Sequence, residues 1–323
     1  MPSRLPLAGP PDPSGPWLSG LPVPLAEGHF PLARLMGQVL AWLDHAAGYP
    51  ELMAATGLAF TWACPCPLAP EPDAAPPEAL LSALGRLGWS RAGLRRNPSP
   101  PEAREIVVAE TSAGRPVLGQ GWAPALGAWC LLAGLTEGGL VVGYTPLGEP
   151  GAPYLAAPPP VTLLLWIGEP GPGEELFPPA CRQAAGSWQR DAGCGATYRA
   201  WQWLLRSEAG SPLSVEPVAA ALTALVEARA AALEFLQRQA AGLPELPEAW
   251  AQRAAEAYAR LLERLEPLAE QLSGPQASRL WGLPEYRAAL AEALAWAEGL
   301  DAEAAVCLRQ APAADYEPDP GEA

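Results

Sequence analysis

The feature that most constrains the fold is a change in hydrophobic period near residue 170. Before it, short apolar runs alternate with Gly-, Pro- and Glu-rich breaks, which is typical of strands in a meandering sheet. After it, residues 177–310 carry apolar side chains at spacings of three and four, which indicates amphipathic helices. Because each period has its own half of the chain, we predict an α+β protein. It would have one domain with a small antiparallel sheet, followed by an all-α helical bundle domain.

Proline and charge mark the ends of these two domains. Residues 1–27 are Pro-rich and aperiodic, so we expect an extended arm there. The sheet domain is predicted at 28–170 and the helical bundle at 177–310. Residues 311–323 mix acidic side chains with prolines, and this composition predicts a disordered acidic tail.

The predicted elements follow from the same periods. Strands are expected at 58–63, 115–122, 128–134, 139–144 and 161–168, with a turn at 137–139 that closes a hairpin. Helices are expected at 30–44, 48–57, 77–87, 101–113, 179–190, 196–205, 215–241, 247–272 and 284–308. We place Glu227 and Arg229 on the outer face of the bundle. The aromatic group Trp188, Tyr198, Trp201 and Trp203 is interpreted as a core or interdomain wedge.

Charged and basic residues exclude several functions. All 20 basic residues are Arg, so no lysine is available for a phosphate loop, a Schiff base or general-base catalysis. With 35 acidic residues the net charge is −15, which disfavours binding to a nucleic-acid backbone. Only two residues, His29 and His45, could take part in histidine chemistry.

Metal, phosphate and membrane signals are weak. The pair Cys64-Pro-Cys66 has a one-residue gap, and we interpret it as two ordinary cysteines rather than a structural metal site. Prolines in the Gly-rich stretch 168–173 remove backbone donors that a phosphate would need. No signal peptide and no run of about 20 apolar residues is evident. We therefore predict a cytoplasmic protein with no cofactor, no metal and no membrane association.

Three central segments, 113–122, 128–134 and 139–148, resemble the sheet of papain-like bacterial proteins. They are most similar to butirosin biosynthesis protein H-like proteins, distant relatives of bacteriocin-processing cysteine peptidases. Segment 49–60 resembles the N-terminal part of that group, and segments 195–201, 227–236 and 254–258 resemble its helical region. The resemblance covers roughly residues 28–310, and it implies a papain-like cysteine-peptidase-like fold for the N-terminal domain.

The same resemblance implies a catalytic triad: a Cys on the first helix, a His that opens a central strand, and an Asp or Asn on the next strand. In this chain residues 28–44 contain no Cys, the His position is Ala128, and the Asp position is Thr145. One rearrangement would keep a thiol and an imidazole, because Cys130 lies two residues beyond Ala128 and His29 lies near the first helix. We interpret Cys130 instead as a small buried apolar residue, which leaves Cys130 and His29 as weak catalytic candidates.

These observations favour a non-catalytic protein, or pseudoenzyme, that binds a small molecule or a protein. A first alternative is a thiol-dependent acyltransferase or cysteine peptidase of the same fold, which would need a thiol with a depressed pKa. A second alternative is a structural role in which the helical half forms a homodimer.

Overall fold

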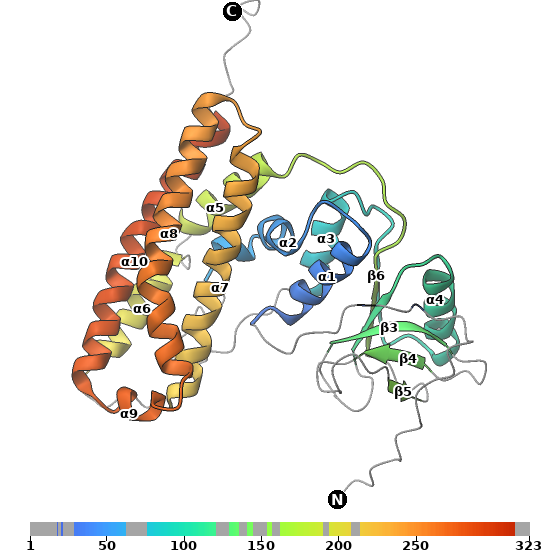
Figure 1. The fold of residues 1–323 in the computed structure, drawn as a ribbon, viewed down its shortest axis with the longest axis horizontal. Coiled ribbons are helices and arrows are strands. Elements are labelled where there is room, and N and C mark those ends of the chain that lie inside the picture. Colours follow the sequence, from blue (N-terminus) through green and yellow to red (C-terminus); the bar gives the residue numbers. More distant parts are fainter. Residues whose placement is uncertain are drawn as a thin grey trace, which may run out of the picture. The chain divides into compact units, whose positions relative to one another are not determined.

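The computed structural model describes residues 18, 21, 29–62, 76–120, 129–135, 141–144, 154–156, 162–189, 194–207 and 214–313 (Figure 1). The chain forms two compact units. Unit 1 comprises Met1–Leu52 and Ala75–Glu174, and unit 2 comprises Met53–Ala74 and Glu175–Ala323. The predicted arm at 1–27 lies outside the described residues except for Leu18 and Leu21. The predicted tail at 311–323 is described only at Ala311–Ala313, which form a 3-10 turn.

Unit 1 contains a six-stranded sheet whose described pairings are all antiparallel. Its spatial order is β1-β6-β2-β3-β4-β5. The strands are β1 (Gly93–Arg96), β2 (Val117–Gln120), β3 (Trp129–Leu135), β4 (Val141–Tyr144), β5 (Tyr154–Ala156) and β6 (Leu163–Trp166). The α+β class and the small antiparallel sheet are thus confirmed. β1 and β5 were not predicted; β1 reads Gly-Leu-Arg-Arg and offers no apolar run.

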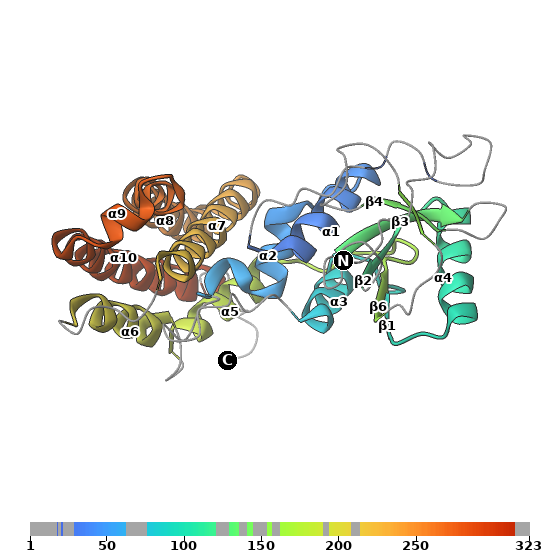
Figure 2. The ribbon, with the colours of Figure 1, turned by 90° about the horizontal axis from the view of Figure 1, so that it is seen from below.

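Helices cover both faces of this sheet. α4 (Pro100–Ser112) lies on one face, and α1 (Pro31–Trp42) and α3 (Pro77–Arg86) lie on the other (Figure 2). α4 begins with a capping box between Ser99 and Glu102, and Pro100 occupies its first turn. Its buried side chains Ala103 and Val107 pack against the central strands, so one apolar core cluster of unit 1 lies between α4 and the sheet.

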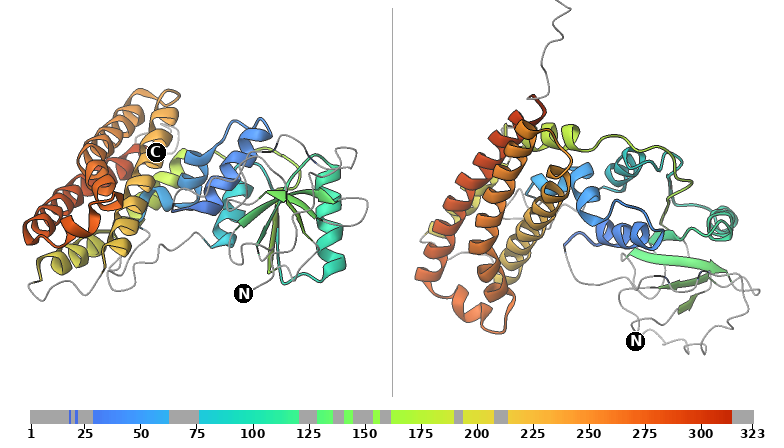
Figure 3. Two further views of the ribbon diagram at one scale, coloured as in Figure 1. Left: turned by 60° about the horizontal axis from the view of Figure 1, so that its bottom comes forward. Right: turned by 45° about the horizontal axis from the view of Figure 1, so that its top comes forward.

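Unit 2 is a helical bundle, as the sequence predicts (Figure 3). The helices are α5 (Phe177–Gln189), α6 (Cys194–Arg206), α7 (Val215–Ala240), α8 (Glu245–Ser273), α9 (Ala277–Trp281) and α10 (Pro284–Gln310). α7 packs on α8, α8 packs on α10, and α5 and α6 pack on α10. Alanine dominates the buried face of α7, which lets the neighbouring helices approach closely. Within the described ranges, no helix has both the length and the hydrophobicity that crossing a membrane requires.

One segment differs from the predicted domain boundaries. Residues 53–62 belong to unit 2, although the sequence reading placed them with the sheet. The strand predicted at 58–63 is wrong for residues 58–60. Helix α2 (Tyr49–Thr56) ends at Gly57, whose φ of +80° turns the chain into the 3-10 helix η1 (Leu58–Phe60). A hydrogen bond of 3.1 Å from Phe60 N–H to the Gly57 carbonyl closes this turn.

Candidate functional site

The most concentrated group of buried polar atoms in the described structure surrounds Arg229 on α7. Its side chain has no solvent exposure, and Asp301 on α10 is 3% exposed. The Arg229 Nε donates to Asp301 Oδ2 at 3.2 Å, and the Nη2 donates to the same oxygen. This ion pair therefore joins two helices inside the bundle.

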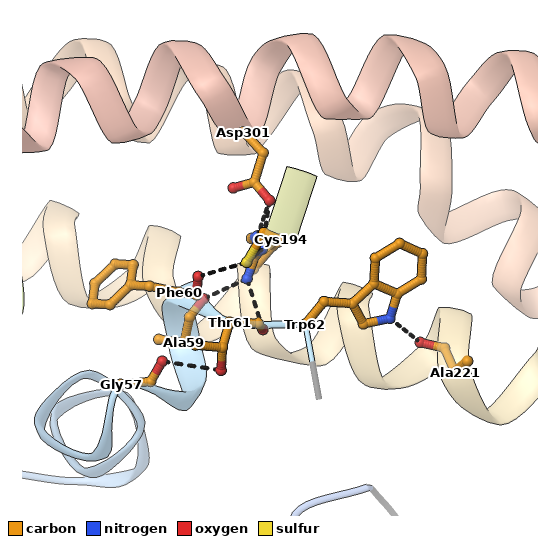
Figure 4. Close-up of polar contacts among 9 residues, drawn as sticks. Gly57, Ala59, Phe60, Thr61, Trp62, Cys194, Ala221 and Asp301 are labelled. Atoms are coloured by element: carbon orange, nitrogen blue, oxygen red, sulfur yellow. Dashed lines mark hydrogen bonds and ion pairs between the residues drawn. The ribbon is translucent and has the colours of Figure 1, made fainter. Parts of the chain in front are cut away.

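The remaining donors of the cluster are directed at the main chain of segment 57–62 (Figure 4). Arg229 Nη1 donates to the Ala59 carbonyl at 2.9 Å and to the Thr61 carbonyl at 3.1 Å. Cys194, the first residue of α6, donates through Sγ to the Phe60 carbonyl at 3.4 Å. Three consecutive carbonyls of the segment are thus bound by side chains of α6 and α7, which satisfies groups that a buried loop would otherwise leave unpaired.

The start of the segment is held by α5. Gln183 Nε2 donates to the Thr56 carbonyl at 3.1 Å. A Cβ at Gly57 would stand 1.9 Å from the same Nε2, so this position combines a left-handed backbone with a close approach of α5. Glycine is the residue type that meets both requirements.

The end of the segment is anchored by aromatic contacts. The Trp62 indole N–H donates to the Ala221 carbonyl at 3.2 Å, and the Trp62 ring stacks on Trp201 with a centroid distance of 5.8 Å. Tyr198 contacts the same indole at 4.8 Å between centroids. An apolar cavity of about 10 Å³ beside Trp62 and Trp201 has room for about one water molecule. The cavity is therefore too small for an organic ligand.

Burial controls the charges in the cluster. Burial raises the pKa of the Cys194 thiol, and the nearby Arg229 opposes that rise only in part. Burial disfavours the charged form of Arg229, yet the Asp301 carboxylate holds the pKa of Arg229 well above its ordinary value. Burial and Asp301 together raise the pKa of Tyr258, whose ring lies 5.8 Å from the guanidinium carbon. The raised pKa keeps the Cys194 thiol protonated at neutral pH, so it donates a hydrogen bond as Arg229 does. We call Arg229, Asp301 and Cys194, which together bind three carbonyls, the Arg229 clamp.

The predicted catalytic candidates lie in unit 1. Cys130 on β3 is fully buried and packs with Ala103 and Val107 on the α4 face of the sheet. His29 is half-buried and precedes α1, which lies on the opposite face (Figure 2). The pairing of Cys130 with His29 stays a prediction, but the packing directs the thiol toward α4 rather than α1.

Other predicted positions lie outside the described residues: Ala128, Thr145, Cys64 and Cys66. Across the described part of the chain, no group of three or more His, Cys, Asp or Glu side chains is arranged to hold a metal ion.

The sequence analysis did not predict the group around Arg229, and its placement of Arg229 and Glu227 is wrong. Arg229 and Glu227 were expected on the outer face, but they are 0% and 8% exposed. The signal was present in the spacing. Arg229 stands in the apolar series Leu222, Leu225, Arg229, Ala232, Leu236, and Asp301 stands in the series Leu294, Ala297, Asp301, Ala304, Leu308. One charge at a core position in each of two helices, with opposite signs, predicts a buried ion pair.

Of the predicted aromatic wedge, Tyr198 and Trp201 are buried in the core, whereas Trp203 is 72% exposed. The wedge interpretation is therefore wrong for Trp203.

Comparison of the chain with protein-family models, with curated proteins and with solved structures gave no significant match.

Proposed function

We propose that this chain is a non-catalytic binding protein. Its N-terminal unit would be a papain-like scaffold of the butirosin biosynthesis protein H-like kind. In that role the protein holds a small molecule or a partner protein and leaves it chemically unchanged. The proposal rests on the state of the thiols, because a cysteine enzyme of this fold needs a thiolate that its substrate can reach.

The four cysteines in the described ranges are all buried: Cys130, Cys181, Cys194 and Cys307. Burial raises the pKa of Cys181 to about 12, although Arg182 acts in the opposite direction. Burial also raises the pKa of Cys307, and Glu303 adds to that rise. A raised pKa keeps a thiol protonated at neutral pH, which is the reverse of what nucleophilic catalysis requires.

The test is the pH dependence of iodoacetamide labelling at each cysteine of the folded full chain, resolved by peptide mapping. We expect these four thiols to label much more slowly than in urea-unfolded protein. Their rates should rise only above pH 8.5, the ordinary range for a thiol.

Two histidine variants sharpen this test. If Cys130 labels rapidly below pH 7 and loses that reactivity in His29→Ala, the protein is an enzyme with a rearranged dyad and the proposal is wrong. His45→Ala is the matched control, because His45 packs on Trp89 at 5.3 Å between ring centroids. That variant should leave the labelling of Cys130 unchanged.

A further inference from the structure

Helices α5 and α6 differ in charge from the rest of the protein. Residues 177–207 contain four Arg and one Asp, whereas the remaining chain contains 16 of the 20 Arg and 34 of the 35 acidic residues. Neither α5 nor α6 contains any Asp or Glu. This part of the bundle is therefore basic on a chain whose net charge is −15.

The outer face of α6 combines this charge with an exposed aromatic ring. Arg199, Trp203 and Arg206 follow one another at spacings of four and three, so they lie along one stripe of the helix. All three are exposed, and Trp203 at 72% is the most exposed large apolar side chain in the described structure. α6 itself lies at the periphery of the bundle (Figure 2).

The stripe stands on a rigid base. On the inner face of α6, Trp201 and Leu205 are 1% and 3% exposed and pack into the bundle. Glu298 of α10 accepts a hydrogen bond of 2.8 Å from Gln202 Nε2 and one of 3.1 Å from Arg199 Nη1. Arg199 is therefore oriented in advance, while Trp203 and Arg206 project from a fixed helix. Such pre-organisation lowers the entropic cost of binding.

We infer that the stripe Arg199–Trp203–Arg206 is a docking surface for an acidic segment of a partner protein. Trp203 is the central apolar anchor, and the two guanidinium groups bind carboxylates on either side of it. Tryptophan and arginine are the residue types that contribute most to protein interfaces, and Arg pairs with carboxylates in bidentate geometry. The inference rests on the proposed binding function and names the partner class.

The charge of the whole chain favours an acidic protein segment over a polyanion. A nucleic acid or an anionic membrane would bring a high density of negative charge against the other 34 acidic residues. A short acidic segment meets the stripe itself, where Glu298 is already paired with Arg199. A convex helix face is also the wrong shape for a small molecule, which needs a concave site.

The test selects from a library of random 12-residue peptides displayed on phage, with the full chain as bait. The best peptide is then labelled with fluorescein, and its Kd is measured by anisotropy. We expect enriched peptides that carry a net negative charge and at least one apolar residue. Trp203→Ala and Arg206→Glu should each weaken binding about tenfold or more, and added salt should weaken it further.

Two exposed positions elsewhere in unit 2 provide matched controls. Leu246→Ala on α8 removes an apolar side chain that is 56% exposed, and Arg279→Glu on α9 reverses an exposed charge. Both should leave the Kd unchanged within about twofold, and circular dichroism should show all four variants folded.

Several outcomes would overturn the inference: no enrichment, enrichment of neutral or basic peptides, or a Kd that is insensitive to both α6 variants. Equal or tighter binding of a 20-residue oligothymidylate or of phosphatidylserine vesicles, lost in the same variants, would assign the stripe to a polyanion instead. If acidic peptides bind with a Kd that the α6 substitutions do not change, the docking surface is wrongly assigned but the proposed binding function is retained. The thiol-labelling experiment tests the absence of catalysis independently.

Discussion

The interiors of the two units differ in polarity. In unit 1 the core cluster between α4 and the sheet consists of apolar side chains and one thiol, Cys130. In unit 2 the bundle encloses the Arg229–Asp301 ion pair and uses it to bind the carbonyls of Ala59 and Thr61. An apolar core tolerates volume-conserving exchanges, whereas a buried charge accepts only one partner geometry. We therefore expect the core of unit 2 to tolerate fewer substitutions than the core of unit 1.

The strongest test of this contrast removes one charge. Arg229→Met should lower the free energy of unfolding by about 3–5 kcal/mol, because Asp301 and two carbonyls lose their partner inside the bundle. Urea unfolding followed by the helical circular dichroism signal measures the change. The double variant Arg229→Met/Asp301→Leu should recover part of the loss, since no unpaired charge remains although the Ala59 and Thr61 carbonyls still lack a donor.

An exposed ion pair supplies the control for that experiment. Arg238 and Glu234 pair along α7 with side chains that are about half exposed. Breaking this pair with Arg238→Ala should change the unfolding free energy by only about 0.3–0.5 kcal/mol. If Arg229→Met costs no more than Arg238→Ala, the clamp contributes little and the contrast between the units fails.

In unit 1 the corresponding test removes volume instead of charge. Leu164 on β6 is fully buried in the α4-facing cluster, so Leu164→Ala should cost about 2–5 kcal/mol through lost burial and the cavity left behind. Hydrogen exchange of peptides from β2 and β6 reports this unit separately. Val108→Ala, at an exposed position on α4, should stay within about 0.5 kcal/mol. Equal hydrogen-exchange protection of β2 and β6 in Leu164→Ala and Val108→Ala would contradict a core at Leu164.

Alkaline pH should weaken the protein because its buried thiols resist ionisation. The pKa of Cys181 is raised by burial to about 12, while an unfolded thiol titrates near 8.5. Between these values the unfolded chain releases a proton that the folded chain keeps. Stability therefore falls as pH rises, by up to about 1.4 kcal/mol per pH unit for this thiol. Urea unfolding of Cys181→Ala between pH 8 and pH 9.5 should show a shallower slope than the unaltered chain, and parallel slopes would refute this.

The smallest effects compare two glycines of unit 2. Gly57→Ala places a Cβ at a φ of +80° and against Gln183, so it should destabilise by about 1–2 kcal/mol. Gly299→Ala lies on the exposed side of α10 with no atom within 4 Å of its Cβ, so it should stabilise by about 0.5–1 kcal/mol. Thermal unfolding of both variants tests the pair, and shifts of the same sign would be the wrong result.

The spacing of apolar residues, together with the Pro, Gly and Ser residues between them, predicted most of the fold. The five long helices of unit 2 begin and end within about two residues of their expected bounds, because each carries an amphipathic stripe closed by Pro, Gly or Ser. β1 was missed because its pairing with β6 compensates for a polar sequence. The strand predicted at residues 58–60 is wrong. Large and small side chains alternate there as in a strand, but this pattern does not reveal the left-handed turn at Gly57.

The candidate site was harder to predict than the fold. A charged residue on a helix is normally solvated, and that expectation placed Arg229 on the surface although its spacing was that of the core. Its partners, Asp301 and Ala59, are 72 and 170 residues away in the chain. The helical spacing could have placed both charges in the core, but it says nothing of the Ala59 and Thr61 carbonyls that Arg229 also binds. Those contacts became visible only in three dimensions.

The clamp also affects how the protein folds as it is synthesised. Ala59 leaves the ribosome 170 residues before Arg229, which is about 10–30 s at ordinary elongation rates. For most of that interval the carbonyls of Ala59 and Phe60 and the indole of Trp62 lack their partners on α6 and α7. We therefore expect the nascent chain to expose this segment until most of unit 2 has emerged, and a chaperone that recognises aromatic stretches would have its clearest opportunity there.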